Sequence, residues 1–430
     1  MSEDAWQWRR GLAWLACLGP LFYLSYGFAN HLAASRSGVP SVVFEWERGI
    51  PFLAWTILPY WTINGFYAAS LLVHRRAADV DRQGRRLLTA QFVAVSCFLL
   101  FPLKFAFTRP ETDGWSGAMF DALTSFDKPY NQAPSLHIAL LVILWSLYTP
   151  KLPRRLRPVL HLWFALIGVS VLTTYQHHFI DIPTGALLGA FCLWCWPEQG
   201  PSPLKSWRRE RSAAHWRLAT YYGLGAIACV ALAFLGGVWL WSLWPATSLF
   251  LVALAYAGLD AQVFQKTAQG GIPPGPRLLL APYLFAARIN QWWWTRGSAA
   301  TVAVGDGVSF GRVPRFGERL MAGESLVDLS AELHGRGEML RAIPCLDLIP
   351  PSPAQLREAC AAIETARGAG SVRVACALGF SRSASAVLAW WLRTGREPSL
   401  EQAEQRLRVL QPRLVLSPAH REAIAAAARD

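Results

Sequence analysis

The chain has 430 residues, of which 53% are hydrophobic, and it contains 21 tryptophans. This composition excludes an ordinary soluble protein over the whole length and indicates that much of the chain lies in a lipid bilayer. The formal net charge of +13 fits basic loops that face anionic lipid headgroups, and without a recognition motif it does not indicate a nucleic-acid partner.

Apolar stretches of about 18 or more residues predict membrane-spanning helices. Three basic loops, at 75–86, 151–157 and 205–217, fix the expected orientation, because short loops rich in Lys and Arg stay in the cytoplasm. We therefore expect a multi-pass protein of a bacterial inner membrane with both termini in the cytoplasm. The eight predicted spans are 11–31, 52–73, 87–106, 135–150, 159–176, 179–197, 219–240 and 244–263.

Polar segments of the first half meet at the outer ends of these predicted spans. They are the segments 104–110, 134–137 and 177–181. His177 and Asp181 are four residues apart and therefore lie on one helical face, so the carboxylate can hold the imidazole in one tautomer and stabilise its cation. An imidazole oriented in this way can attack phosphorus.

These segments resemble the three signatures of the type 2 phosphatidic-acid phosphatase superfamily. The form Pro134-Ser135-Leu136-His137 is similar to the inositol phosphorylceramide synthase branch. The resemblance implies a six-helix lipid phosphatase or phosphotransferase domain over 1–200, with two additional spans in 201–265. It also implies that His177 forms a phosphohistidine, Asp181 orients it, His137 protonates the leaving alkoxide, and Lys104, Arg109 and Ser135 bind the phosphoryl oxygens.

The sequence departs from that superfamily at two places. Only four residues separate Lys104 from Arg109, where the first signature has six. Ser170 and Val171 stand where the third signature has Ser-Arg, so one phosphate-binding arginine is missing.

Residues 266–296 join the two halves. The run 270–276 is rich in Gly and Pro, and 277–296 carries three consecutive tryptophans between arginines. Such a segment suits an amphipathic helix in the headgroup layer, and a plain structural connector is the alternative.

From about residue 297 the pattern becomes that of a soluble α/β domain, which we expect to extend to residue 430 and to lie in the cytosol. The sequence predicts strands at 302–305, 326–329 and 371–375, and helices at 354–367, 384–393 and 400–410. About 130 residues are enough to bury a core.

The most informative motif is Cys376-x5-Arg382, in which an apolar strand runs into a turn and then a helix. A helix N-terminus stabilises a thiolate, and Gly379 lets the loop backbone close around an anion. Arg382 would supply a planar fork that fits phosphoryl oxygens. This arrangement predicts a cysteine-dependent phosphatase site.

This half resembles the dual-specificity branch of the protein tyrosine phosphatases, from Gly311-Arg312-Val313-Pro314 to the helix after the motif. The resemblance implies a phosphocysteine on Cys376, a phosphate held by Arg382, and Ser383 assisting breakdown of the phosphoenzyme. A general acid is also needed, and Asp347 is favoured over Asp328 for that role. Ala375 stands where the family has histidine, so one support of the loop is absent.

We therefore expect a membrane-bound bifunctional phosphatase with sites on opposite faces of the bilayer. The expected partners are the membrane, a phospholipid or lipid phosphate, and for the inner site also a phosphoprotein. Neither mechanism needs a metal or another cofactor. Two alternatives remain open: the outer site transfers a phospho-headgroup between lipids, or the protein is a non-enzymatic phosphate-binding sensor or scaffold.

Overall fold

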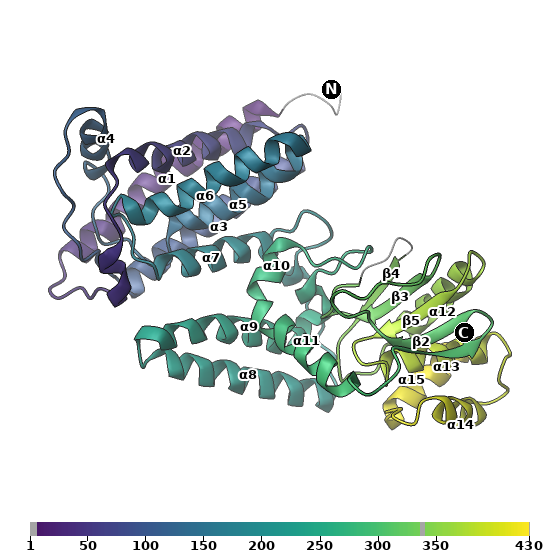
Figure 1. Ribbon diagram of the computed structural model, residues 1–430. Coiled ribbons are helices and arrows are strands. Elements are labelled where there is room, and N and C mark those ends of the chain that lie inside the picture. The colour runs from purple at the N-terminus through teal and green to yellow at the C-terminus, as the bar shows by residue number, and fades with distance from the viewer. Residues whose placement is uncertain (1–6, 336–339, 430) are drawn as a thin grey trace. The chain divides into compact units, whose positions relative to one another are not determined.

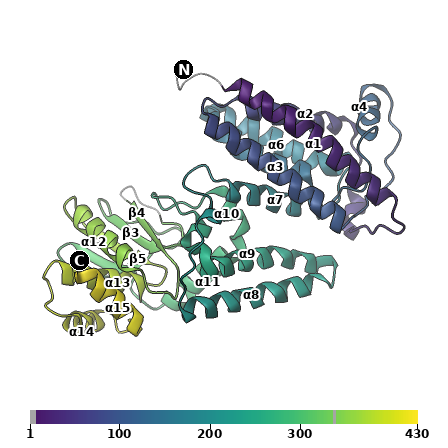
Figure 2. The ribbon, with the colours of Figure 1, turned by 180° about the vertical axis from the view of Figure 1, so that it is seen from behind.

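The computed structural model describes residues 7–335 and 340–429. The chain divides into two compact units, Met1–Ser202 and Pro203–Asp430, which we call the first and the second unit. The ribbon in Figure 1 and the view from behind in Figure 2 show that the first is helical and that the second combines helices with a sheet.

The first unit is a helical bundle built around α5. Because α5 is apolar on all sides, it is buried on all sides: Ala139 and Ile143 pack in a cluster with α1, α3 and α7, while Leu141 and Leu144 pack with α2 and α6. The helices are α1 (Trp8–Ala34), α2 (Ile57–Leu72), α3 (Ala77–Leu100), α4 (Gly114–Thr124), α5 (Leu136–Lys151), α6 (Arg157–Thr173) and α7 (Asp181–Cys195).

Two glycines let α7 approach α5 closely. A Cβ atom on Gly185 would lie 2.5 Å from the Ser135 carbonyl oxygen, and one on Gly189 would lie 2.7 Å from that of Ala139. Small residues four apart are a common contact surface between membrane helices. The close contact brings the N-terminus of α7 beside the N-terminus of α5, where the Ser135 N–H donates to the Asp181 carbonyl oxygen.

The second unit begins with a helical hairpin formed by α8 (Ala213–Ala233) and α9 (Leu243–Leu254), which lie side by side in both ribbon views. Residues Ala255–Leu259 continue α9 as a π-helix. The short α10 (Pro274–Leu279) and then α11 (Ala281–Thr295) lead from the hairpin to the sheet.

The α/β part of the second unit has a five-stranded sheet in the order β1-β2-β5-β3-β4. Only the pair β1 and β2 is antiparallel among the described pairs. One face packs against α12 and α13, whereas the other packs Ala375 and Leu326 beneath Ala287 of α11. The elements are β1 (Thr301–Gly305), β2 (Val308–Arg312), β3 (Ser325–Ser330), β4 (Leu340–Cys345), α12 (Pro353–Arg367), β5 (Val372–Cys376), α13 (Arg382–Arg393), α14 (Leu400–Leu410) and α15 (Pro418–Arg429).

Within the described residues, four helical stretches are long and apolar enough to cross a membrane: Trp8–Ala34, Arg154–Thr173, Ala213–Ala233 and Gly237–Phe264. Leu136–Lys151 and Asp181–Cys195 are apolar but shorter. Eight spans therefore remain a prediction.

The largest boundary difference concerns α3, which begins at Ala77 rather than near residue 87 and ends at Leu100 rather than 106. The charged turns stay helical because their side chains are paired. Asp81 accepts from Arg10, and Asp79 accepts from Arg82 one turn later. The segment from 101 to 113, which includes Lys104 and Arg109, is consequently a loop.

Candidate active sites

The loop from Cys376 to Arg382 connects β5 directly to α13. Gly379 has φ +82°, and a Cβ there would lie 2.6 Å from the Gly311 carbonyl carbon. Only glycine fits this position, because a side chain would meet both a strained backbone and the β2 main chain. The neighbouring Val313 N–H donates to the Cys376 carbonyl oxygen at 2.8 Å, which holds the loop against the end of β2.

The Cys376 sulfur faces two hydrogen-bond donors. The Gly379 N–H points to Sγ at 3.2 Å and the Ser383 Oγ lies 3.3 Å from it. Both donors stabilise a thiolate, and the N-terminus of α13 adds a favourable dipole. This geometry suits a reactive thiolate, and Ser383 is in contact with the sulfur; its role in phosphoenzyme breakdown stays a prediction.

Arg382 is buried and holds two carboxylates. Its Nη1 and Nη2 donate to the two oxygens of Glu332 at 3.0 and 2.6 Å, and Nη2 also donates to Asp347 Oδ1 at 2.8 Å. Nη1 further donates to the Cys345 carbonyl oxygen. These bonds use the four Nη hydrogens, and the Nε–H is the fifth donor of a guanidinium. A phosphate held by Nε and Nη2 would take the Nη2 hydrogen that binds Asp347 and would displace that residue. Glu332 would stay bound to Nη1 and to the other Nη2 hydrogen.

Asp347 lies in the loop after β4, on the wall of the same cavity as Cys376. Burial raises the pKa of this carboxyl above its ordinary value, with the Glu332 carboxylate adding to the rise and Arg382 opposing it. A carboxyl group with a raised pKa that is released from Arg382 can give a proton to a leaving oxygen.

The rival acid, Asp328, has a structural partner. Its side chain and that of Lys266 are fully buried and form an ion pair, and Lys266 also donates to the Ser330 carbonyl oxygen. Asp328 thus anchors the segment after the hairpin to β3.

Gln291 of α11 is a support that sequence reasoning missed. Its Nε2 donates to the carbonyl oxygens of Val313 and Ala377 at 2.8 and 3.0 Å, and the residue is buried. Ala375, where histidine was expected, packs its methyl group beneath α11. The loop is braced from outside the α/β fold, and its sequence neighbours give no signal of this.

A second missed residue, His420 at the start of α15, braces the other end of the loop. Its Nε2 lies 2.8 Å from Ser381 Oγ, and its Nδ1 accepts from the Ser417 backbone N–H. Nε2 therefore carries the proton and donates to Ser381. Burial, followed by the nearby Arg421 charge, lowers the pKa of His420, which favours this neutral form.

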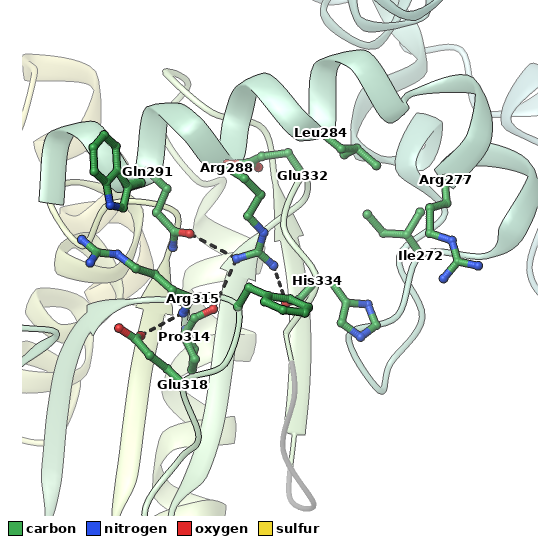
Figure 3. A pocket seen from close by; sticks show the side chains of 12 residues that line it. Ile272, Arg277, Leu284, Arg288, Gln291, Pro314, Arg315, Glu318, Glu332 and His334 are labelled. Carbon is green, nitrogen blue, oxygen red and sulfur yellow. Dashed lines mark hydrogen bonds between the residues drawn. The ribbon is translucent and has the colours of Figure 1, made fainter. Parts of the chain in front are cut away.

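α11 also borders a second cavity, which has a volume of about 490 Å³. Figure 3 shows Leu284, Arg288 and Gln291 on that face. Arg288 donates to the carbonyl oxygens of Pro314 and His334, so it fastens α11 to the α/β part.

In the first unit, His177 lies between Ser135 and Asp181. Its Nδ1 is 3.1 Å from Asp181 Oδ2, and its Nε2 is 3.1 Å from Ser135 Oγ. A carboxylate only accepts, so Nδ1 carries the proton and Nε2 presents its lone pair. The predicted pair of His177 and Asp181 and the predicted Ser135 are thus brought together.

The adjacent His178 is a structural residue with a partner that the sequence did not reveal. Its Nδ1 is 2.9 Å from Glu47 Oε2, while its Nε2 accepts from the Ala106 N–H at 3.0 Å. The ring also stacks on Phe105. Glu47 and His178 therefore position the loop that leads to Arg109.

A cavity of about 190 Å³ lies beside His177. It is lined by Arg109, which stacks over Phe120, and by Lys128 and the partly buried Asp127. Lys104 is exposed and does not line it. Lys128 lines the cavity where Lys104 was expected, and its distance from the signature motifs gave no clear signal of this.

His137, in the first turn of α5, stacks on Tyr60 with ring centroids 4.1 Å apart, and it is not among the residues that line the cavity. Its Nε2 is buried without a hydrogen-bond partner among the described residues. Ser170 and Val171 are buried in α6, and the Val171 carbonyl oxygen accepts from the His177 N–H.

No protein-family model and no curated protein matches the chain. Among solved structures, it is similar to Tk-PTP in its active form, with 24% identity over 30% of this chain and 97% of that chain and a TM-score of 0.28. A variant of human DUSP28 has 23% identity over 30% of this chain and 95% of that chain, with a TM-score of 0.28. PTPMT1 in complex with PI(5)P has 14% identity over 30% of this chain and 96% of that chain, with a TM-score of 0.26.

Proposed function

We propose that this protein is a membrane-bound phosphatase that hydrolyses phosphate monoesters through a phosphocysteine on Cys376. The observation that carries the proposal is the loop itself, in which the Gly379 N–H and the Ser383 hydroxyl face the sulfur while the buried Arg382 begins the next helix. An activated sulfur, backbone N–H groups and a guanidinium are what phosphoryl transfer requires.

In the proposed mechanism the Cys376 thiolate attacks phosphorus and the S–P bond forms as the ester P–O bond breaks. Asp347 gives its proton to the departing alkoxide. Water then attacks the phosphocysteine, returns a proton to the Asp347 carboxylate, and releases inorganic phosphate and the thiolate. Ser383 supports the leaving sulfur in this second step.

The test is turnover of p-nitrophenyl phosphate by the full chain in detergent or nanodiscs. We expect Cys376→Ser to abolish turnover and His177→Ala to retain it. Cys376→Ser is nearly isosteric, whereas His177→Ala removes a buried imidazole, so a circular dichroism melt of each variant serves as the folding control. Equal activity of Cys376→Ser and the unaltered protein would refute the proposal.

We further propose a second phosphoryl-transfer site at His177 on the outer face of the membrane. It is supported by the Ser135, His177 and Asp181 contacts and by the adjacent cations Arg109 and Lys128. His177 Nε2 would form a phosphohistidine. Since His137 does not line the cavity, its proposed role as acid requires the substrate to reach beyond the cavity wall.

Water and a lipid alcohol are alternative acceptors at this second site. Labelled phospholipid donors, supplied with and without an acceptor alcohol, distinguish a hydrolase from a headgroup transferase by their lipid products. If His177→Ala and the unaltered protein give identical products, the site only binds phosphate, as a sensor or scaffold would.

A further inference from the structure

We propose that the substrate of the Cys376 site is a lipid phosphomonoester that enters from the bilayer along α8, α9 and α11. This inference rests on the proposed phosphatase function and names its substrate class. It excludes a phosphoprotein as the preferred substrate.

The first observation is that one cavity joins the catalytic groups to the helical hairpin. Its volume is about 1030 Å³, which is at the upper end of the range for small-molecule sites and far more than a phosphate needs. Cys376, Arg382 and Asp347 lie in its wall together with residues of α8, α9 and α11. All of these belong to the second unit.

The second observation is that the hairpin is fastened to the catalytic part by buried polar contacts. The Tyr256 hydroxyl, on the π-helical continuation of α9, donates to the Asp347 carbonyl oxygen at 2.9 Å. Lys266, just beyond it, forms the buried ion pair with Asp328. A hairpin residue thus supports the loop that carries the proposed general acid.

The third observation is the chemistry of the helical wall. A peptide bound there would leave backbone N–H and C=O groups without partners, which is costly, whereas acyl chains need none. The polar residues that these helical segments contribute to the wall, other than tyrosine, are Ser212, Arg217 and Asn290. The same wall also contains Tyr222, Pro245, Leu249, Pro282 and Ala286.

The fourth observation is that the cavity adjoins an apolar outer surface. Leu249 lines the cavity, while the next residue, Phe250, is 54% exposed on the outside of α9. Leu224 and Ile227 of α8 are similarly exposed. The stretches Ala213–Ala233, which is α8, and Gly237–Phe264, which contains α9, are long and apolar enough to cross a membrane. Lipid tails beside the hairpin are therefore next to the cavity.

The place at which the phosphate would bind fits this route. Leu249 is seven residues from Tyr256, roughly 10 Å along a helix, and Tyr256 contacts the Asp347 loop. If acyl chains lie at Leu249, the phosphate of the same lipid could therefore reach Arg382 and Cys376 across the length of its headgroup.

The first experiment measures kcat/KM for monomeric n-alkyl monophosphates of two to eight carbons with the full chain in nanodiscs, in the His177→Ala background so that only the Cys376 site contributes. If the chains are buried in the cavity, kcat/KM rises about fourfold for each added methylene. A phosphotyrosine peptide and short-chain phosphatidic acid are compared in the same preparation, and the lipid is expected to be the better substrate.

The second experiment uses Ala286→Trp and Leu249→Trp, which place an indole in the helical wall. Each should lower the ratio of kcat/KM for octyl phosphate to that for p-nitrophenyl phosphate by about tenfold or more. Ile289→Trp is the matched control, because Ile289 is exposed on the same helix and lines neither cavity bordering α11. Its ratio should stay unchanged.

Failure of this inference is distinguishable from failure of the proposed function. A flat chain-length series, or a phosphopeptide that exceeds the lipid, overturns the lipid route even when Cys376→Ser abolishes all turnover. Turnover that survives in Cys376→Ser when the other proposed site is also removed by His177→Ala overturns the phosphatase function itself. An equal loss of the ratio in Ile289→Trp overturns the assignment of the cavity wall.

Discussion

The pair of Arg382 and Glu332 offers the sharpest test of how the Cys376 site is built. Glu332→Gln keeps the size of the side chain but removes the charge opposite a buried guanidinium. The Arg382 and Glu332 side chains are 3% and 4% exposed and share two hydrogen bonds. Breaking such a pair costs about 3 kcal/mol. We expect unfolding of the second unit roughly 6 to 12 °C lower and kcat/KM reduced about 100-fold because Arg382 loses its orientation.

The chain supplies a matched control in Glu324→Gln. Glu324 also binds an arginine, Arg373, through two hydrogen bonds, and their side chains are 1% and 8% exposed. Neither residue lines the catalytic cavity. Calorimetry should therefore show similar losses of stability for Glu332→Gln and Glu324→Gln. In contrast, kcat/KM of the folded fraction for p-nitrophenyl phosphate should fall only for Glu332→Gln. Equal activity of the two variants would refute the role of Glu332 in orienting Arg382.

Three further changes test other parts of the two sites. Asp347→Asn should lower kcat for an alkyl phosphate by about 10² to 10⁴. Because the pKa of Asp347 is raised, the unaltered enzyme should lose activity as pH rises through that pKa. The pH profile of the variant should lack this alkaline decline in activity. Gln291→Leu leaves two buried carbonyl groups without their donor, which should lower the free energy of unfolding by about 1 to 3 kcal/mol for each group. Hydrogen exchange should then show faster opening of the loop after Cys376. Gly185→Ala places a methyl group 2.5 Å from the Ser135 carbonyl oxygen. In a labelled-lipid assay, product formation at the His177 site should therefore fall, while turnover at Cys376 is retained.

The centre of the α/β domain could be predicted because its signals are local, whereas β2, β4 and α15 are not among the predicted elements. A buried strand, a Gly-containing loop and a helix follow one another at Cys376, and β5 and α13 lie within two residues of their predicted bounds. Glu332 and Gln291 could not be predicted in the same way. They are 50 and 86 residues from groups they support, Arg382 and the Ala377 carbonyl oxygen, and only the folded sheet and α11 bring them near.

The helical half was predictable in its apolar stretches and less so at their ends. Hydropathy cannot show that a charged turn stays helical when each charge has a partner, as it does at the start of α3. Nor can it show which cation borders a cavity. Lys104 matched a signature by type, yet the loop after α3 leaves it exposed, and Lys128 lines the cavity instead.

Ala375 explains why the hairpin and the catalytic domain form one compact unit. With alanine before Cys376, the loop lacks the hydrogen bond that a histidine would give, and the small methyl group lets α11 pack directly on the sheet. Gln291 of that helix then holds the Ala377 carbonyl oxygen, and Tyr256 of the hairpin holds the Asp347 loop. α11 and the π-helical end of α9 thus support the loops that carry Cys376 and Asp347, so under the proposed function a ligand that displaced either helix would change catalysis as well as binding.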